Sequence, residues 1–363
     1  MKTLCLLFAL AQLRPVHTFS IVARDPATGQ IGVAVQSHWF AVGQLVPWAE
    51  PGIGAVATQS FVDPSYGKLG LELLRNGKSA PDSLRALLTA DPSCEVRQVA
   101  MIDANGNVAT FTGAKDIQAA GGIAGNGAPA SAGPSQASGG ALPAKAGAVP
   151  AKAGAPLGFV QCGGAGGTLT IGHDFSVQAN LMSNDKIWPA MAKAYSESKG
   201  DLTDRLLAAL DAAQSVGGDI RGKQSAALIV VDAKERLFDL RVDDAPEPLK
   251  ELRRLVALQR AYNHMNAGDL ATEHNDNVGA LREYSAAEEI ASTTPGVPES
   301  RYAEMIYWHA VALVNMKRVD EALPLFARAF AMEKGWRELT PRLPKSGLLP
   351  DDEKLIERIV GAK

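Results

Sequence analysis

Thr18-Phe19-Ser20-Ile21-Val22-Ala23-Arg24-Asp25 is the stretch that decides the fold. Polar and apolar side chains alternate along it, which is the period of a β-strand. A turn cluster follows over residues 25–29, and Ile31-Gly32-Val33-Ala34-Val35 predicts a second strand. The two segments therefore predict an antiparallel hairpin with a longer loop at the start of a β-rich domain.

Residues 1–17 have the order of a secretory leader. Lys2 provides a basic start, and an apolar run from Leu4 to Leu13 follows that is too short to span a bilayer. We expect the leader to be cut after His17, which makes the protein periplasmic or secreted. Two alternatives stay open: a cut near Ala9-Leu10-Ala11, and an uncut, cytoplasmic chain.

A cut after His17 gives Thr18 a chemical role. Its hydroxyl then lies beside its own free α-amine, whose pKa of about 7.7–8.0 leaves a fraction of it uncharged near neutral pH. An N-terminal threonine amine can accept the proton of the adjacent hydroxyl, which activates that hydroxyl as a nucleophile. One residue thus supplies nucleophile and base.

Composition excludes several classes of protein. The chain has 363 residues, 46% of them hydrophobic, and a net charge of −3, so it has room for two domains and no basic nucleic-acid footprint. Neither its six histidines nor its three cysteines show a metal-ligand spacing, and no nucleotide-binding motif is present. We expect no metal and no cofactor. Cys94 and Cys162 follow the leader, and both a disulfide and two free thiols remain open.

Short strands and helix pairs alternate after the leader. The patterns predict strands over 54–59, 98–103, 108–112, 176–182, 225–231 and 237–242, and helices over 69–75, 81–90, 187–197 and 202–215. Asn105-Gly106 is a strong hairpin turn between two of these strands. The order of elements favours a layered α+β domain over residues 18–247.

Two other regions have different compositions. Residues 119–167 are mostly Gly, Ala, Pro and Ser, which predicts a disordered insertion. Residues 248–363 lack strand patterns and predict a helical region. In that region Ala280, Tyr284 and Ala287 recur with the same spacing as Ala322, Phe326 and Ala329. This is similar to a degenerate tetratricopeptide (TPR) helix pair, whose concave face would recruit a protein partner.

At this point the sequence resembles the DUF1028 family. The resemblance rests on the hairpin residues above together with segments in one order, namely Phe40-Ala41-Val42-Gly43, Val46-Pro47-Trp48-Ala49, Gly52 to Gln59, Asp63-Pro64-Ser65-Tyr66-Gly67, Phe175 to Met182 and Gly217 to Ala227. It implies a four-layer αββα sandwich of the N-terminal-nucleophile (Ntn) hydrolase superfamily, in which helical C-terminal appendages occur and homo-oligomers are common. A Trp-Ala-Gly-His-like segment expected after Gly113 is not recognisable.

The candidate site residues are polar residues in or beside apolar strands. The nucleophile is Thr18, with Ser20 as the alternative, and Asp219 would orient Arg221, a cation that would lower the pKa of the Thr18 amine. The other candidates are Ser37 and Asn180 for catalysis and Thr58, Gln59, Gln178, Lys223 and Ser225 for substrate binding. The alternative for Thr18 is a threonine that only begins a strand, and for Ser37 it is a turn residue. For the polar residues within strands (Thr58, Gln59, Gln178 and Asn180) the alternative is a structural hydrogen bond. For the segment 219–225 it is a solvated loop with an ion pair.

Two functions remain in competition. The first is an Ntn-type amidohydrolase that cleaves a small amide or a peptide through Thr18. The second is a non-catalytic binding or scaffold protein, which the unrecognised Trp-Ala-Gly-His-like segment favours. In that case the sandwich is a scaffold and the helical region binds the partner.

Overall fold

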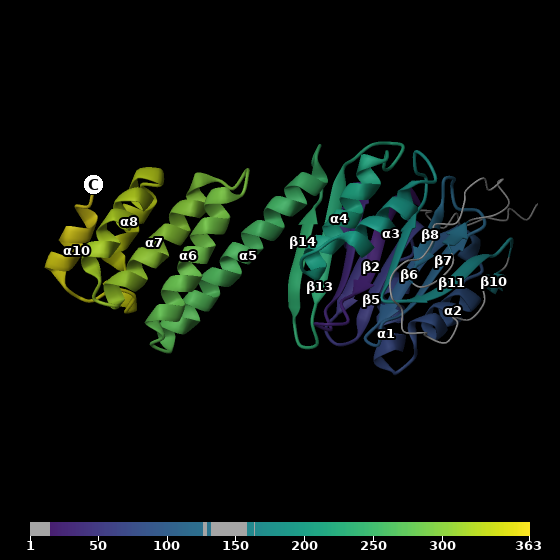
Figure 1. Ribbon diagram of the computed structural model, residues 1–363, viewed down its shortest axis with the longest axis horizontal. Helices are drawn as coiled ribbons and strands as arrows, with labels where there is room; N and C mark the ends of the chain where they lie inside the picture. The colour runs from purple at the N-terminus through teal and green to yellow at the C-terminus, as the bar shows by residue number, and fades with distance from the viewer. Residues whose placement is uncertain (1–14, 126–128, 132–157, 163) are drawn as a thin grey trace, which may run out of the picture. The chain divides into compact units, whose positions relative to one another are not determined.

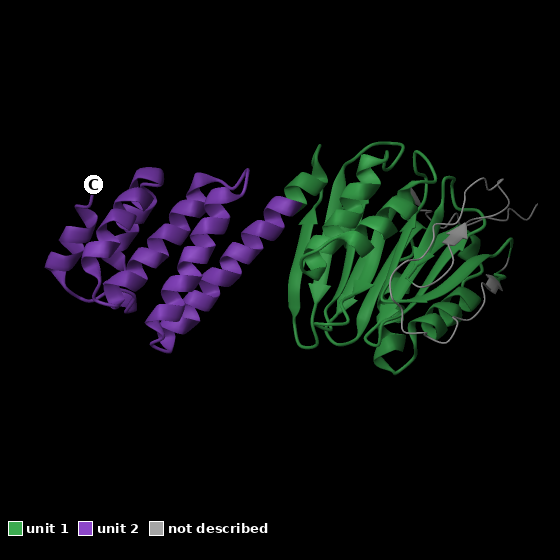
Figure 2. Ribbon diagram, viewed as in Figure 1, with its two compact units in different colours: residues 1–252 green, residues 253–363 purple. Residues whose placement is uncertain are grey.

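The computed structural model describes residues 15–125, 129–131, 158–162 and 164–363 (Figure 1). The chain forms two compact units, residues 1–252 and 253–363, which are coloured separately in Figure 2. The sequence predicted this boundary at Pro248. The structure moves it to Leu252, because the first turn of helix α5 (Pro248–Glu273), with its buried Leu249 and Leu252, belongs to the first unit.

Two antiparallel sheets form the centre of the first unit (Figure 1). The first has the order β1-β5-β6-β7-β11-β10, with β4 also paired to β5; the second has the order β14-β13-β3-β2-β12-β8-β9. The strands of the first sheet are β1 (Pro15–Val16), β4 (Pro47–Glu50), β5 (Gly54–Phe61), β6 (Arg97–Asp103), β7 (Asn107–Gly113), β10 (Gly158–Val160) and β11 (Gly167–His173). Those of the second are β2 (Thr18–Arg24), β3 (Ile31–Ser37), β8 (Gly121–Ala124), β9 (Pro129–Ser131), β12 (Phe175–Ala179), β13 (Ser225–Val231) and β14 (Arg236–Val242).

Helix pairs cover the outer faces of the two sheets. Helices α1 (Ser65–Arg75) and α2 (Ala80–Ala90) pack on the first sheet, and α3 (Ile187–Glu197) and α4 (Leu202–Ser215) pack on the second. Two short 3-10 helices, η1 (Val42–Gln44) and η2 (Cys94–Val96), lie in the connections. The layers therefore run helix, sheet, sheet, helix, and the predicted α+β class is confirmed.

The predicted hairpin is present as β2 and β3, which pair from Thr18↔Ser37 to Arg24↔Ile31. Both faces of β2 are buried, since the other sheet covers one and helices cover the other. Gly32 in β3 allows the close approach of α4, because a Cβ at this position would come within 2.5 Å of the Leu206 side chain. The hairpin is thus the middle of the sandwich.

Local signals explain where the helices begin. Ser79 caps α2 by accepting a hydrogen bond from the N–H of Asp82, and Asp201 caps α4 in the same way. Helix α1 begins at Ser65, four residues before the predicted position 69, because Asp63 accepts a hydrogen bond from the Ser65 N–H at 2.9 Å and starts the first turn.

The prediction of a disordered insertion over residues 119–167 is wrong at both ends of that range. Strand β8 pairs with both β12 and β9, β10 pairs with β11, and β11 begins at Gly167. The small residues here show no periodic pattern of apolar side chains that would predict a strand. These strands form because their backbone groups pair with partner strands. Residues 132–157 lie outside the described chain. Strand β12 is also shorter than predicted, since Leu181 has φ of 57° and leaves the ladder.

All of the regular elements in the second unit are helices. Besides most of α5 it contains α6 (Asn277–Thr293), α7 (Glu299–Asn315), α8 (Val319–Met332), α9 (Gly335–Leu339), η3 (Thr340–Arg342), η4 (Pro344–Ser346) and α10 (Glu353–Val360). The two repeated trios predicted from the sequence are all buried, on α6 and α8 respectively. In the part of the chain that the structure describes, no helix combines the length and apolar character needed to cross a bilayer.

A disulfide resolves the alternative left open for the cysteines. Cys94 in η2 bonds to Cys162, just after β10, with a Cα–Cα distance of 5.8 Å, inside the normal range. The bond joins residues 68 apart in sequence, so it closes a long loop that contains the Gly- and Ala-rich segment.

Reduction of this disulfide is expected to destabilise the protein. Opening so long a loop raises the entropy of the unfolded chain, and the free energy of unfolding should fall by about 2–4 kcal/mol. Urea denaturation with and without dithiothreitol measures the change. The double variant Cys94→Ala/Cys162→Ala is the control and should not respond to dithiothreitol; an unchanged midpoint in the native chain would contradict the prediction.

Candidate functional site

Thr18 lies where the chain crosses from one sheet to the other. Val16 in β1 pairs with Ser60 in the first sheet, whereas Thr18 is the first residue of β2 in the second. The Thr18 side chain is fully buried, and its hydroxyl donates a hydrogen bond of 2.7 Å to the carbonyl of Gln36. Only His17 connects the two strands, so its peptide groups lie between the sheets.

The carbonyl oxygen of His17 accepts two hydrogen bonds. Ser37 Oγ donates one at 2.5 Å, and Arg221 Nη2 donates another at 2.8 Å. Asp219 holds the guanidinium in place, with Oδ1 2.9 Å from the Arg221 backbone N and 3.0 Å from Nε, and Oδ2 2.7 Å from Nη2. Asp219 is itself buried and also accepts a hydrogen bond from the backbone N–H of His38. A hydroxyl and a positioned cation are therefore aimed at the acyl oxygen that precedes Thr18.

The His17 side chain is buried against two neighbours. Its Nδ1 lies 2.8 Å from Asn180 Oδ1, and its ring meets the Phe61 ring edge-on with centroids 5.8 Å apart. Burial is the main cause that lowers the pKa of His17; the charge of Arg221 also lowers it, while Asn180 and Asp219 oppose the shift. The surroundings of the imidazole therefore favour its neutral form.

A network of buried amides fixes which atom of Asn180 faces His17. Gln98 Nε2 donates to the carbonyl of Ala179 at 2.9 Å, and since a carbonyl can only accept, the orientation of the Gln98 amide is determined. Gln98 Oε1 then accepts from Gln59 Nε2 at 2.7 Å and from Asn180 Nδ2 at 2.9 Å. With its Nδ2 committed in this way, Asn180 presents its Oδ1, a hydrogen-bond acceptor, to His17.

The same network reaches Thr18 and the candidate Ser20. Gln59 Nε2 donates to the carbonyl of Thr18 at 3.1 Å, and Ser20 Oγ donates to Gln59 Oε1 at 2.6 Å. Gln178 Nε2 lies 3.3 Å from Ser20 Oγ and 3.1 Å from the carbonyl of Ala57. These side chains connect the two sheets, so binding a substrate through Gln59 or Gln178 would require internal hydrogen bonds to be exchanged.

The other predicted substrate-binding residues have partners outside this cluster. Thr58 donates to the carbonyl of Asp63, and Lys223 forms an ion pair with Glu247. Ser225 lies opposite Ser37 in the ladder, but its hydroxyl donates to the carbonyl of Trp39 at 2.5 Å. The structure therefore brings together Thr18, Ser37, Asn180, Asp219 and Arg221, with Gln59 at the edge of the group.

Two residues of this region were not anticipated. His17 was assigned to the leader, so no site role was considered for it. Asp116 follows Gly113 in a segment without a recognisable pattern; burial raises its pKa to about 7, against the opposing effects of the Ser60 hydroxyl, the Gly113 N–H and Arg97. Nothing in the sequence pattern distinguishes this aspartate from one in an exposed turn.

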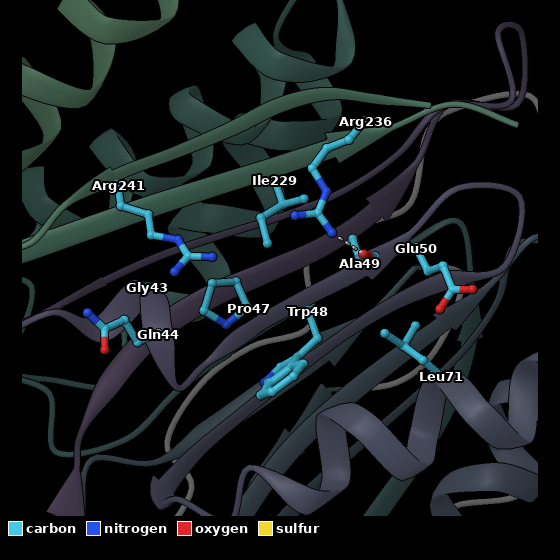
Figure 3. A pocket seen from close by; sticks show the side chains of 10 residues that line it. All are labelled: Gly43, Gln44, Pro47, Trp48, Ala49, Glu50, Leu71, Ile229, Arg236 and Arg241. Atoms are coloured by element: carbon cyan, nitrogen blue, oxygen red, sulfur yellow. Dashed lines mark hydrogen bonds between the residues drawn. The ribbon is translucent and has the colours of Figure 1, made fainter. Parts of the chain in front are cut away.

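A separate cavity of about 480 Å³ opens elsewhere in the first unit (Figure 3). In Figure 3 the arginines of β14 lie on one side and Pro47 and Trp48 of β4 on the other, and Arg236 donates to the carbonyl of Ala49. Asp239 pairs with both Arg236 and Arg241, so much of their charge is neutralised. None of the Thr18 cluster lines this cavity. Over the described residues, no cluster of His, Cys, Asp and Glu has the arrangement of a metal site.

Comparison with known proteins shows the family to which this chain belongs. The model of the family of unknown function DUF1028 matches residues 18–156 and 160–252, more than half of the chain, so the chain belongs to this family. The match begins at Thr18 and ends with the first unit. A solved structure that it resembles is protein SPO2555 from Silicibacter pomeroyi, described with the same family; the identity is 25%, the TM-score is 0.49, and the match covers 66% of this chain and 88% of that one. No curated protein matches.

Replacing Gln98 by leucine is expected to destabilise the first unit strongly. Gln98→Leu has a similar volume but removes the acceptor for Asn180 Nδ2 and the donor for the Ala179 carbonyl, and both groups stay buried. The free energy of unfolding should fall by about 2–5 kcal/mol in urea denaturation. Gln30→Leu in the hairpin loop is the matched control and should change it by less than about 0.5 kcal/mol. Equal values for the two variants would contradict the role of the network.

The buried neutral His17 predicts a pH dependence of the full chain. Because its pKa is lower in the folded than in the unfolded state, its contribution is complete above about pH 6.5 and is lost as the pH falls through the folded pKa. The melting temperature should therefore fall more between pH 7.5 and pH 5 in the native chain than in His17→Gln.

Asp116 changes stability in the opposite direction, since its raised pKa makes the folded state less stable as the pH rises towards 7. The effect of Asp116 is common to both chains and cancels in the comparison. An NMR titration of the His17 ring gives a direct second measurement. A midpoint at or above 6.5 would show that the ring is not held neutral.

Proposed function

We propose that this protein is an N-terminal-nucleophile amidohydrolase whose nucleophile is Thr18, freed by removal of the residues before it. One observation carries the proposal: the carbonyl that precedes Thr18 already accepts hydrogen bonds from Ser37 Oγ and Arg221 Nη2. When Thr18 Oγ attacks a carbonyl carbon, negative charge develops on the carbonyl oxygen. Donors in this position, next to the threonine hydroxyl, are what that oxyanion requires.

Thr18, Ser37 and Arg221 each have a defined part in the proposed reaction. The Thr18 α-amine takes the proton of the Thr18 hydroxyl, and Oγ attacks the carbonyl carbon of the substrate amide. Ser37 and Arg221 hold the developing oxyanion. The C–N bond breaks, the leaving amine takes the proton from the α-amine, and an ester on Thr18 remains. Water, activated by the same amine, hydrolyses the ester and regenerates the hydroxyl.

Asp219 is a positioning residue in this scheme. It is buried, accepts hydrogen bonds from three donor groups of Arg221, and so holds an Nη2–H of the guanidinium directed at the acyl oxygen. The positive charge of Arg221 also disfavours a second charge on the Thr18 amine, which keeps the amine available as a base. The family match that begins at Thr18 and the expected secretory leader both agree with a mature chain that starts there.

A second candidate function belongs to the helical unit. A cavity of about 380 Å³ is lined by Tyr284 and Trp308 together with the acidic residues Asp269 and Glu273. Aromatic and acidic side chains around one hollow suit a cationic segment of a partner protein. This observation favours a TPR-like recruiting role for residues 253–363, alongside or instead of catalysis in the first unit.

The proposed nucleophile can be tested by replacement. A chain that begins at Thr18, released from a cleavable fusion partner, should hydrolyse fluorogenic peptide amides, and Thr18→Ala should lower kcat/KM at least about 10³-fold. Thr18→Ser should keep measurable activity, because serine retains the hydroxyl. Thr28→Ala, in the exposed turn of the same hairpin, is the matched control and should not change the rate.

Mass spectrometry of the protein recovered from an exporting host tests maturation directly. The expected mass is that of residues 18–363. A mature chain that begins at any other residue, or activity that survives Thr18→Ala, would overturn the proposal.

A further inference from the structure

Residues 15–17 are held beside Thr18 by three kinds of contact. The backbone of β1 pairs with Phe61 and Ser60 at the edge of β5. Val16 is completely buried in the core cluster that also contains Val46 and Val62. The His17 carbonyl and side chain have the partners described above, so this short segment is bound by its backbone, by both its described side chains and by its acyl oxygen.

From this arrangement we infer that the place of residues 15–17 is the binding site for the acyl part of the substrate, and that the substrate is an extended peptide. The peptide has a small apolar residue followed by an uncharged residue that donates a hydrogen bond, and it is cleaved after that second residue. The inference rests on the proposed function, which places the attacked carbonyl next to Thr18 Oγ. Before maturation the chain occupies its own site.

The backbone contribution follows from strand pairing. Without β1, the edge of β5 at Ser60 and Phe61 has no partner strand, since β4 covers only the other end of β5, from Gly54 to Ala57. The Phe61 carbonyl keeps a hydrogen bond from Arg97. An extended peptide can pair with such an edge and place alternate side chains in fixed positions. A small amide without a peptide backbone would lack these contacts.

The amide network determines the side chain that precedes the cleaved bond. Asn180 must present Oδ1 because its Nδ2 is committed to Gln98, so this position requires a hydrogen-bond donor. An apolar side chain would leave a buried acceptor without a partner. A lysine or arginine would bring a second cation close to Arg221. Neutral histidine, asparagine and glutamine meet both conditions.

The residue before it must be small and apolar. Val16 has no exposed surface and lies among aliphatic side chains, so a charged or large residue would be buried there without partners or space. The preferred acyl part of the substrate is therefore similar to the protein's own Val16-His17. Hydrolysis then proceeds through an ester between the peptide acyl group and Thr18 Oγ, which water cleaves.

Binding can be measured without turnover. The probe is the fluorescein-labelled peptide Pro-Val-His amide, and the protein is the chain 18–363 carrying Thr18→Ala, which lacks the nucleophile. Fluorescence anisotropy should show binding at least about tenfold tighter than to the full chain 1–363, in which residues 15–17 compete, and at least about tenfold tighter than that of Pro-Val-Leu amide. Equal binding to the two chains, or no preference for His over Leu, would overturn the inference.

A trimmed chain that fails to fold alone still gives a test. In that case millimolar Pro-Val-His amide should restore its melting transition and Pro-Val-Leu amide should not, because the missing strand is supplied from outside. If Pro-Val-His amide does not restore the melting transition, the inference is overturned.

Hydrolysis of the corresponding coumarin amides by the unsubstituted chain 18–363 separates the two proposals. Binding with the expected preference but without hydrolysis contradicts the proposed function and leaves the peptide site in place. Hydrolysis without preference for Pro-Val-His contradicts the peptide site and leaves the proposed function in place.

Discussion

The pairing of Thr18 with Ser37 at the open end of the central hairpin is the constraint on which the rest of the first unit depends. It places the first residue of β2 at the crossing between the two sheets, and it brings the Ser37 hydroxyl to the carbonyl of His17. A shift of register by one residue would turn the Thr18 side chain to the other face of the sheet and move Ser37 away. The flanking strands β12 and β13 oppose such a shift, because each pairs along β2 or β3.

Amide side chains take the place of a purely apolar core around this crossing. Burying several glutamines and an asparagine is costly unless all of their polar groups are paired, and here Gln98 contacts side chains or carbonyls from both sheets. In exchange for this cost, the network fixes the orientation of the Asn180 amide. In an apolar core Asn180 could rotate its amide freely, whereas in this network it offers one defined atom to its neighbour. Specific geometry at Thr18 is thus a property of the whole core.

The sequence was sufficient for the strands with strong periodic patterns and for the grouping of Thr18, Ser37, Asp219 and Arg221. The hairpin register alone brings Thr18 to Ser37, and the spacing of Asp219 and Arg221 allows their ion pair. Strands β8 and β11 were missed or truncated, because glycine carries no periodic signal and these strands are stabilised by partner strands distant in sequence.

His17 was missed for a different reason: a residue expected to be removed was not considered as part of the fold. The residues Thr58, Lys223 and Ser225 have the right chemistry, but strand direction and loop path take their side chains to other partners.

Burial of the junction between His17 and Thr18 has a consequence for the order of events in the cell. Val16 and Thr18 have no accessible surface and His17 is 3% exposed, so a processing peptidase cannot reach this bond in the folded chain. In the proposed maturation, an external enzyme that removes the residues before Thr18 must therefore act before β1 docks on β5. For the same proposed cleavage, if docking comes first, only groups already inside the protein are in a position to break the bond, so the relative speed of folding would decide between the two routes.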